Sequence, residues 1–593
     1  MTTAPAARPH ATHQVLNQVP PLADYDVADD PALLAAAGRE GAGWAGDRLR
    51  ELGRLAGAAA TQEHARLANE HPPVLRTHDA RGNRIDEVEF HPSWHVLLGT
   101  AVRHGLHATP WAEQQPGAHV ARAAAFYVWA QAEAGHGCPV SMTYAVVPAL
   151  RHAPELAGQF EPLLTAPVYQ PGLRPPGGKA GLLAGMAMTE KQGGSDVRAG
   201  TTRAEPAGPD RAGAHLITGH KWFCSAPMSD LFLVLAQGPG GLSCFLLPRV
   251  LPDGSRNAMR LQRLKDKLGN RSNASAEVEF DGALAWPVGP AGRGVPTIIE
   301  MVSATRLDCV LGSAAGMRRG AVAAAYYSTH RQAFGKDLIA WPLMGSVLAD
   351  LILESEAATT LAIRLAGAAD RAARGDAAEA ALLRVALPAA KHWVCKRAPL
   401  HAAEALECLG GNGYVEESGM PRLYRDSPLN SIWEGSGNVT ALDLLRALRR
   451  QPAAAEALTA ELALAVGGDR RLDEAIGRLT AGLAGLGAER RSGAGGSGGS
   501  PLGKQSGGSS PRADTAGPDA EYAARRLAGQ ITLALQAALL VRHAPAAVAD
   551  GFCASRLGAG AATGPGGPGV PFGTLPDGVA VTEILDRARL APR

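Results

Sequence analysis

The spacing of hydrophobic residues predicts a mainly helical domain over residues 1–182. Apolar positions recur at helical intervals in residues 31–70 and again in residues 94–164. Residues 1–30 are rich in proline and polar residues and are expected to form an extended arm, while residues 72–92 favour a loop or a short hairpin. Breaks between the helices are expected at Pro110, Pro116, Pro139 and Pro154.

The pattern changes near residue 183. From there to residue 285, short apolar runs rich in β-branched and aromatic residues are separated by Gly, Pro and Asp at the spacing of strands and turns. The runs are LLAGMAMTE, AHLITGHKWFCSA, DLFLVLAQ, LSCFLLPRV and SAEVEF. We therefore expect a compact antiparallel β-domain over residues 183–285.

Residues 286–450 return to long helical patterns with short connections. The expected helices span 296–333, 343–374, 378–409 and 438–450. Long helices joined by short turns are typical of an antiparallel bundle, and Pro452 marks the end of the last one.

The last region, residues 451–593, is expected to be a further α-helical domain. Helical patterns cover residues 453–486 and 521–550. Between them, residues 488–520 are rich in Gly, Ser and Pro with a single leucine, so we expect a disordered insert that cannot pack into a core. A second stretch of this kind, residues 558–579, precedes a short final helix.

Composition narrows the class of protein. The chain has 593 residues, 46% of them hydrophobic, which allows several domains with large cores. No apolar run approaches the roughly 18–20 residues of a membrane span, and the N-terminus lacks the apolar segment of a signal peptide. Seven scattered cysteines without a CxxC pair suggest neither a disulfide framework nor a zinc site. We expect a cytoplasmic protein without a bound metal.

Two stretches of the predicted β-domain carry candidate chemistry. Residues 188–196 (MTEKQGGSD) follow a strand and form a turn rich in hydroxyl and amide donors, which suits a heteroaromatic ring edge or a phosphate. A Gly-Gly-Ser turn is equally typical of an ordinary loop. Residues 219–225 (GHKWFCS) place Trp222 near a strand end, where it covers one face of a planar cofactor or simply belongs to the core.

Two stretches of the predicted bundle are comparable. Residues 331–336 (RQAFGK) end a long helix with an Arg and a Lys that suit a pyrophosphate, although they also suit the negative end of the helix dipole. Residues 408–414 (CLGGNGY) contain closely spaced glycines that let a ligand approach the backbone. No GxGxxG follows a strand in a βαβ unit, so a Rossmann dinucleotide site is not indicated.

One acid stands out near the end of the bundle. Glu434 lies between Trp433, which we expect to be buried, and the turn Gly435-Ser436-Gly437. A lone carboxylate between apolar surface and exposed backbone amides suits a general base beside a cofactor. The alternative is an ordinary acid that caps the following helix.

The order of these stretches resembles the acyl-CoA dehydrogenase family from about residue 30 to residue 450. Within that family, the chain is most similar to bacterial flavoproteins of the alkylation response. The similarity rests on REGAGW at 39–44, MTEKQGGSDV at 188–197, LKDKLGNRSNAS at 264–275 and NSIWEGSGN at 430–438. A weaker similarity continues past residue 450.

The resemblance implies an α+β multidomain acyl-CoA dehydrogenase fold, bound FAD and a homotetramer. The β-domain and the bundle are expected to contact the flavin, and Arg331 and Phe334 are expected to reach the FAD of a neighbouring subunit. Cys224 occupies a position that is often Thr in the family, where its backbone amide can still serve the flavin. The residues implied in FAD binding are Met188, Thr189, Gly193, Gly194, Ser195, Trp222, Cys224, Arg331, Phe334, Gly410, Gly411, Trp433, Gly435, Ser436, Gly437 and Asn438.

The resemblance also implies a reaction, the α,β-dehydrogenation of an acyl thioester. A carboxylate removes the α-proton while the β-hydrogen leaves as hydride to the flavin. Glu434 matches the acid of the family motif and is the expected catalytic base. Some members place the base on the earlier helix, at the position of Thr305, which cannot act as one.

The C-terminal region has a modest surplus of positive charge. From Arg446 onward, 17 Lys/Arg and 13 Asp/Glu give +4, so the rest of the chain carries −2 of the total +2. A solvated helix face explains such arginines, but the resemblance implies sequence-independent binding of double-stranded DNA and a role against alkylation damage. The candidate DNA contacts are Arg446, Arg449, Arg450, Arg470, Arg471, Arg478, Arg525 and Arg526.

The leading interpretation is a DNA-binding flavoprotein of the alkylation response with a weak, branched-chain (isovaleryl-like) dehydrogenase activity. Two alternatives remain open at this point. They are a metabolic acyl-CoA dehydrogenase that acts on a branched or medium acyl chain without a role at DNA, and a non-catalytic flavoprotein that shields DNA.

Overall fold

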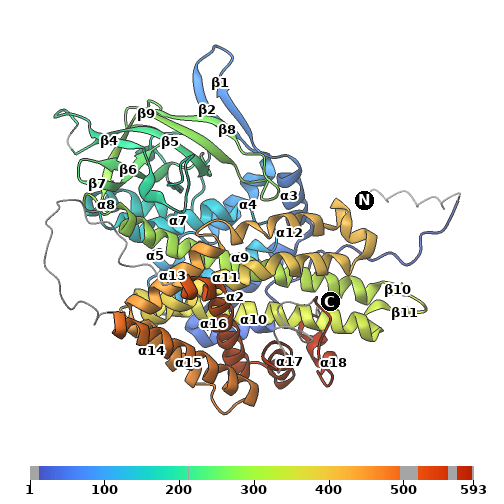
Figure 1. Ribbon diagram of the computed structural model, residues 1–593. Helices are drawn as coiled ribbons and strands as arrows, with labels where there is room; N and C mark the ends of the chain where they lie inside the picture. Colours follow the sequence, from blue (N-terminus) through green and yellow to red (C-terminus); the bar gives the residue numbers. More distant parts are fainter. Residues whose placement is uncertain (1–11, 212, 494–517, 559–570, 590–593) are drawn as a thin grey trace.

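A computed structural model describes residues 12–211, 213–493, 518–558 and 571–589. Apart from a small hairpin on the other side of the molecule, the labelled strands gather in one region, and helices make up most of the rest (Figure 1). None of the described helices is long and apolar enough to cross a membrane.

The N-terminal region is helical, as predicted, and residues 74–89 form the short hairpin that was one of two alternatives for this stretch. Asp30 starts the first helix by accepting hydrogen bonds from the backbone amides of Ala32 and Leu33. The helix break predicted at Pro139 lies a few residues earlier, at residues 131–136. This proline lies in the first turn of α7, where its missing N–H has no partner to lose. The elements are α1 (Pro31–Ala37), α2 (Gly46–Gly57), α3 (Ala59–Glu70), β1 (Val74–His78), β2 (Arg84–Glu89), α4 (Pro92–Arg103), α5 (Thr109–Ala112), α6 (Ala118–Ala130), α7 (Gly137–Leu150) and α8 (Pro154–Leu164).

The β-domain is largely antiparallel, as predicted, with β3 as the main exception. β3 pairs in parallel with β6, and β4 meets β6 through a single parallel pair. β6, β4, β5, β9 and β7 pair in turn, and β7 returns to β6, so the strands close around a core that includes Phe232, Phe245 and Phe280. The strands are β3 (Ala184–Ala187), β4 (Arg203–Pro206), β5 (His215–Ser225), β6 (Leu231–Gly238), β7 (Gly241–Pro248), β8 (Met259–Leu264) and β9 (Ser275–Val288).

The bundle contains the four helices expected from the sequence. The first one ends at His330, earlier than expected, because the chain turns there into a small hairpin. The elements are α9 (Gly294–His330), β10 (Gln332–Ala333), β11 (Lys336–Asp337), α10 (Pro342–Ala373), α11 (Ala377–Glu407), α12 (Met420–Asp426) and α13 (Gly437–Arg450).

The C-terminal region is divided differently from the prediction. The expected helix over 453–486 is two helices, because Gly467 and Gly468 interrupt it. Of the expected disordered insert, residues 488–493 and 518–520 are helical, and residues 494–517 lie outside the described residues. In the second stretch, residues 559–570 also lie outside the described residues. The helices are α14 (Pro452–Ala463), α15 (Arg470–Gly493), α16 (Pro518–His543), α17 (Ala546–Leu557) and α18 (Val581–Leu585).

The C-terminal helices do not form a separate small core. Ile531 and Leu540 of α16 belong to the same buried cluster as Leu348 of α10 and Val385 of α11. In Figure 1, α16 lies among the bundle helices rather than beside them. The described part of residues 451–593 is therefore an extension of the bundle.

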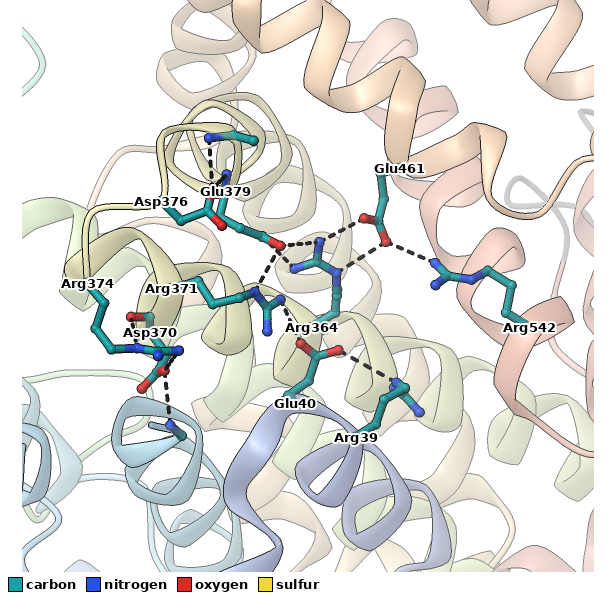
Figure 2. A network of polar contacts seen from close by, with 12 residues as sticks. Arg39, Glu40, Arg364, Asp370, Arg371, Arg374, Asp376, Glu379, Glu461 and Arg542 are labelled. Carbon is teal, nitrogen blue, oxygen red and sulfur yellow. Dashed lines mark hydrogen bonds and ion pairs between the residues drawn. The ribbon is translucent and has the colours of Figure 1, made fainter. Parts of the chain in front are cut away.

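A buried ionic network joins the three helical regions (Figure 2). Arg371 of α10 binds Glu40 of the N-terminal region at 2.9 Å. Arg364 of α10 binds Glu461 of α14 at 2.8 Å, and Arg542 of α16 binds the same carboxylate at 3.2 Å. The REGAGW stretch that marked the resemblance thus supplies a contact between the helical regions.

Candidate active site

Glu434 lies in a tight turn directly before α13. Both Glu434 and Gly435 have positive φ, at 58° and 99°, so the backbone is left-handed at two successive residues. The Thr305 hydroxyl of α9 donates a hydrogen bond to Glu434 Oε2 at 2.7 Å. Arg306 Nε donates to the Glu434 carbonyl oxygen at 3.2 Å. The alternative base position named above is thus in direct contact with the expected base.

The surroundings of Glu434 favour its protonated form. Burial raises the pKa of this carboxyl, and the Thr305 hydrogen bond with the charges of Arg306 and Lys391 offsets only part of that rise. Arg306 is itself paired with Asp443 at 2.8 Å, which compensates its charge. The carboxylate is therefore a stronger base than an exposed glutamate.

An apolar cluster lies beside the carboxylate. Trp433 is half-buried rather than buried as expected, and it packs on this cluster together with Met188. The cluster combines Met142 of α7 with Met301 of α9 and residues of the β-domain. Glu434 thus lies where the three domains meet.

Two further polar side chains, Cys138 and Lys267, lie near Glu434. Burial raises the pKa of the Cys138 thiol to about 11, and the charges of Lys267 and Glu434 both act on it. Burial lowers the pKa of Lys267 to about 8. Sequence reasoning gave neither residue a role, although Lys267 lies in LKDKLGNRSNAS, one of the stretches that carried the resemblance.

The two expected cofactor stretches of the β-domain, residues 188–196 and 219–225, are joined by a backbone hydrogen bond. The Trp222 amide donates to the Thr189 carbonyl oxygen at 2.8 Å. Beneath this contact, Lys221 and Glu190 form a buried ion pair at 2.8 Å. Burial raises the pKa of Glu190, but hydrogen bonds from Lys221 and the neighbouring loop lower it further, to a value well below the usual range. The pair fixes the base of the loop, while Gly193, Gly194 and Ser195 are exposed.

Trp222 and Cys224 have different surroundings. Trp222 is half-buried, and Lys265 Nζ lies 3.3 Å from its ring centroid. The Cys224 side chain is fully buried in the core of the β-domain, which raises its pKa to about 12. The Cys224 thiol is therefore closed to a ligand on the surface of the domain, and the role expected for its backbone amide stays a prediction.

The start of α13 suits a phosphate group. A Cβ at Gly437 would lie 2.4 Å from Lys396 Cε, so a larger residue there would displace this cation. The Ser436 hydroxyl makes no capping hydrogen bond within the described structure, and Arg525 Nε donates to Asn438 Oδ1 at 2.8 Å. Unclaimed amides at a helix N-terminus together with two cations favour an anion. These residues fit a cofactor with a planar ring and a phosphate tail.

Four expected FAD residues lie far from Glu434 in the same chain. Arg331 and Phe334 follow the C-terminal end of α9, and Asn412, next to Gly410 and Gly411, binds Tyr327 near that end at 2.9 Å. Thr305 and His330 are 25 residues apart on α9, which corresponds to about 37 Å along the helix. In Figure 1 the β10–β11 hairpin projects on the side away from the β-domain. Phe334 at its tip is 94% exposed.

The candidate DNA-binding arginines are also dispersed. Several are bound locally: Arg446 to Asp443, Arg470 to Glu474, and Arg471 to Asp469 and Asp550. Arg525 contacts Asn438 at the candidate cofactor site. Arg478 and Arg526 are exposed and form no ion pair with another described side chain. Arg449 is half-buried and Arg450 is exposed at the end of α13.

Three protein-family models match the chain. They are "Adaptive response protein AidB N-terminal domain" over residues 17–171, "Acyl-CoA dehydrogenase, middle domain" over residues 185–283, and "Acyl-CoA dehydrogenase, C-terminal domain" over residues 292–449. Their boundaries agree closely with the three structural regions that meet at Glu434.

Individual proteins show the same relationship. The chain is 50% identical over 471 residues to "Putative acyl-CoA dehydrogenase AidB" of Escherichia coli (strain K12), which covers 79% of this chain and 86% of that protein. The solved structure of Caenorhabditis elegans ACDH-11 in complex with C11-CoA matches with a TM-score of 0.79 at 27% identity, over 94% of this chain and 95% of that one. The apo form of Bd2924 matches with a TM-score of 0.76 at 30% identity, over 90% of this chain and 100% of that one. The chain therefore belongs to the acyl-CoA dehydrogenase family, and its N-terminal region is of the AidB type.

Proposed function

We propose that the chain is an FAD-dependent acyl-CoA dehydrogenase-type enzyme with Glu434 as its catalytic base. The observation that carries the proposal is the Glu434 carboxylate, which lies beside an apolar cluster, is hydrogen-bonded to Thr305, and has a raised pKa. Family membership supports the cofactor and the type of reaction. The C11-CoA in the ACDH-11 structure supports an acyl-CoA as the class of substrate.

Each part of the site has a role in this reaction. Glu434 takes the α-proton of the thioester, and the electrons of that C–H bond form the new C=C bond as the β-hydrogen leaves as hydride. FAD, when bound, supplies the acceptor for this hydride. The apolar wall around Trp433 excludes water and keeps the carboxylate basic. Thr305 holds the carboxylate in one orientation.

We extend the proposal to a flavin site shared between copies. Arg331 and Phe334 follow the end of α9, about 37 Å along the helix from Thr305, and Gly410 and Gly411 lie near the same end, so these residues are too distant to join Glu434 in one chain. The exposed β10–β11 hairpin supports a contact with a second subunit, in line with the homotetramer that the resemblance implied.

The enzymatic proposal is tested by anaerobic reduction of the purified flavoprotein. A panel of acyl-CoA thioesters, including isovaleryl-CoA and longer straight chains, should bleach the flavin absorbance of the wild type. Glu434→Gln should retain the flavin and lose at least about 10³-fold in reduction rate, because removal of a general base forfeits its full contribution. Unchanged reduction in Glu434→Gln would exclude this residue as the base.

We further propose that the chain binds double-stranded DNA and acts in the response to alkylation damage. Support comes from the 50% identity to AidB, the adaptive-response model over the N-terminal region, and the exposed Arg478 and Arg526. Duplex binding should weaken steeply between low and high salt. Absence of binding would leave the metabolic alternative, and binding without any flavin reduction would leave the non-catalytic one.

A further inference from the structure

Lys391 of α11 is a buried cation, and no described carboxylate lies within ion-pair distance of it. Its side chain is 1% exposed. Buried lysines are rare, and most are paired with an acid. The Lys391 ammonium instead donates to two backbone oxygens, that of Trp433 at 2.8 Å and that of Gly435.

These two oxygens flank the proposed catalytic base. The residue between them, Glu434, has a φ of 58°, and the next residue, Gly435, has a φ of 99°. A left-handed conformation costs a non-glycine residue roughly 1–2 kcal/mol, so this turn needs support from outside itself. A charged donor that binds a carbonyl on either side of Glu434 provides it, because the two oxygens converge on Lys391 only while the turn keeps this shape.

The neighbouring carbonyls are held in the same way. Arg306 of α9 binds the Glu434 oxygen at 3.2 Å, and the His392 ring lies within hydrogen-bond distance of the Gly437 oxygen at 3.0 Å. Side chains from two bundle helices therefore hold the backbone on both sides of the carboxylate. Lys391 differs from the other two because it contacts both residues that adjoin the base.

We infer that Lys391 is a positioning residue for Glu434: by binding the carbonyl oxygens of Trp433 and Gly435 it holds the turn that directs the carboxylate at the substrate α-carbon. The inference rests on the proposed function, since it requires Glu434 to be the base. The described hydrogen bonds of Lys391 go to these backbone oxygens and not to the Glu434 carboxylate.

The test uses the flavin-loaded protein and compares Lys391→Met with Lys391→Arg. Single-turnover reduction by the best acyl-CoA of the panel should slow by about 100-fold in Lys391→Met, since a base displaced by about 1 Å loses that much. The dissociation constant for the thioester should change less than threefold. The pH profile should move to higher pH, because the lost charge no longer favours ionised Glu434. Lys391→Arg, which keeps the charge and donors, should recover most of the rate.

Arg397→Met is the matched control. Arg397 is a buried cation on the same helix, but it is paired with Glu354 at 3.0 Å, away from the turn. This variant should lose thermal stability and keep the reduction rate and pH profile when assayed below its unfolding temperature. An equal loss of rate in Arg397→Met would assign the Lys391 effect to general destabilisation.

A double variant separates the two proposals. If Lys391 acts through Glu434, adding Lys391→Met to Glu434→Gln should not reduce the residual rate further. An additional 100-fold loss, or a wild-type rate in Lys391→Met alone, overturns the inference while leaving Glu434 as the base. Unchanged reduction in Glu434→Gln overturns the proposed function instead. If Lys391→Met does not fold, Lys391→Gln, which keeps one donor, is measured in the same cycle.

Discussion

Removal of the Glu461 carboxylate should loosen the C-terminal helices from the bundle. Glu461 is 8% exposed and accepts hydrogen bonds from Arg364 at 2.8 and 3.2 Å and from Arg542 at 3.2 Å. In Glu461→Gln, Arg364 keeps its second partner, Glu379, whereas Arg542 loses its described partner. Breaking a buried ion pair costs about 3–5 kcal/mol, and the retained Glu379 contact reduces the expected loss to about 2–3 kcal/mol.

The measurement is urea unfolding of wild type and variant, followed by hydrogen exchange of α14 and α16. Glu456→Gln is the control, because Glu456 lies exposed on the same helix. Faster exchange confined to α14 and α16 is expected in Glu461→Gln, with no change in Glu456→Gln. Equal stability of the two variants would refute the view that this network fastens the C-terminal helices.

The loss of stability in Glu461→Gln should also depend on pH. Burial raises the pKa of Glu461, but the hydrogen bonds and charges of Arg364 and Arg542 lower it further, so the folded pKa lies below the unfolded one. The stabilisation is therefore complete above the unfolded pKa and disappears as the pH falls through the folded one. The difference between wild type and Glu461→Gln should shrink below about pH 4.

Other variants test separate parts of the site. Thr305→Val removes the hydrogen bond that favours ionised Glu434, so the pKa of Glu434 should rise and the pH profile of flavin reduction should move to higher pH; an unshifted profile would argue against this contact. Lys221→Met leaves Glu190 buried without its partner at a cost of about 3–5 kcal/mol, and the purified protein should contain less flavin per chain. Gly437→Ala places a methyl group against Lys396 and should weaken FAD binding in a fluorescence titration, whereas an unchanged affinity would place the phosphates elsewhere. Phe334→Asp should leave the fold intact and reduce the mass measured by light scattering if the hairpin joins subunits.

Much of the architecture follows from local patterns. Helical spacing predicts the four bundle helices, and alternating apolar runs predict the β-domain, because each reflects residues a few positions apart. The misplaced boundaries have local causes too. Pro139 is tolerated in a first turn, and Gly467 and Gly468 end a helix that periodicity alone would continue. The parallel pairing of β3 with β6 has no such local cause. About 40 residues separate the two strands, so no short pattern in the sequence predicts that they pair.

The same division applies to the candidate site. The motif around Glu434 predicts this residue as the base, and the neighbouring Trp and glycines indicate its setting. No pattern in the sequence joins Glu434 to Thr305, 129 residues earlier, or to Lys391 on another helix. The side of the strand on which the Cys224 thiol lies is likewise decided by packing, because its neighbours in the core come from distant strands.

The sequence by itself determined most of the elements and the family, and it singled out Glu434 as the expected base. Only the tertiary structure decided that the C-terminal helices share the core of the bundle, that Arg525 lies beside Asn438, and that four expected cofactor residues are remote from Glu434. The physical reason is that backbone propensity and amphipathic spacing act within one element. The pKa of a carboxylate and the support of a strained turn instead depend on groups that only the packing of several elements brings within hydrogen-bond distance.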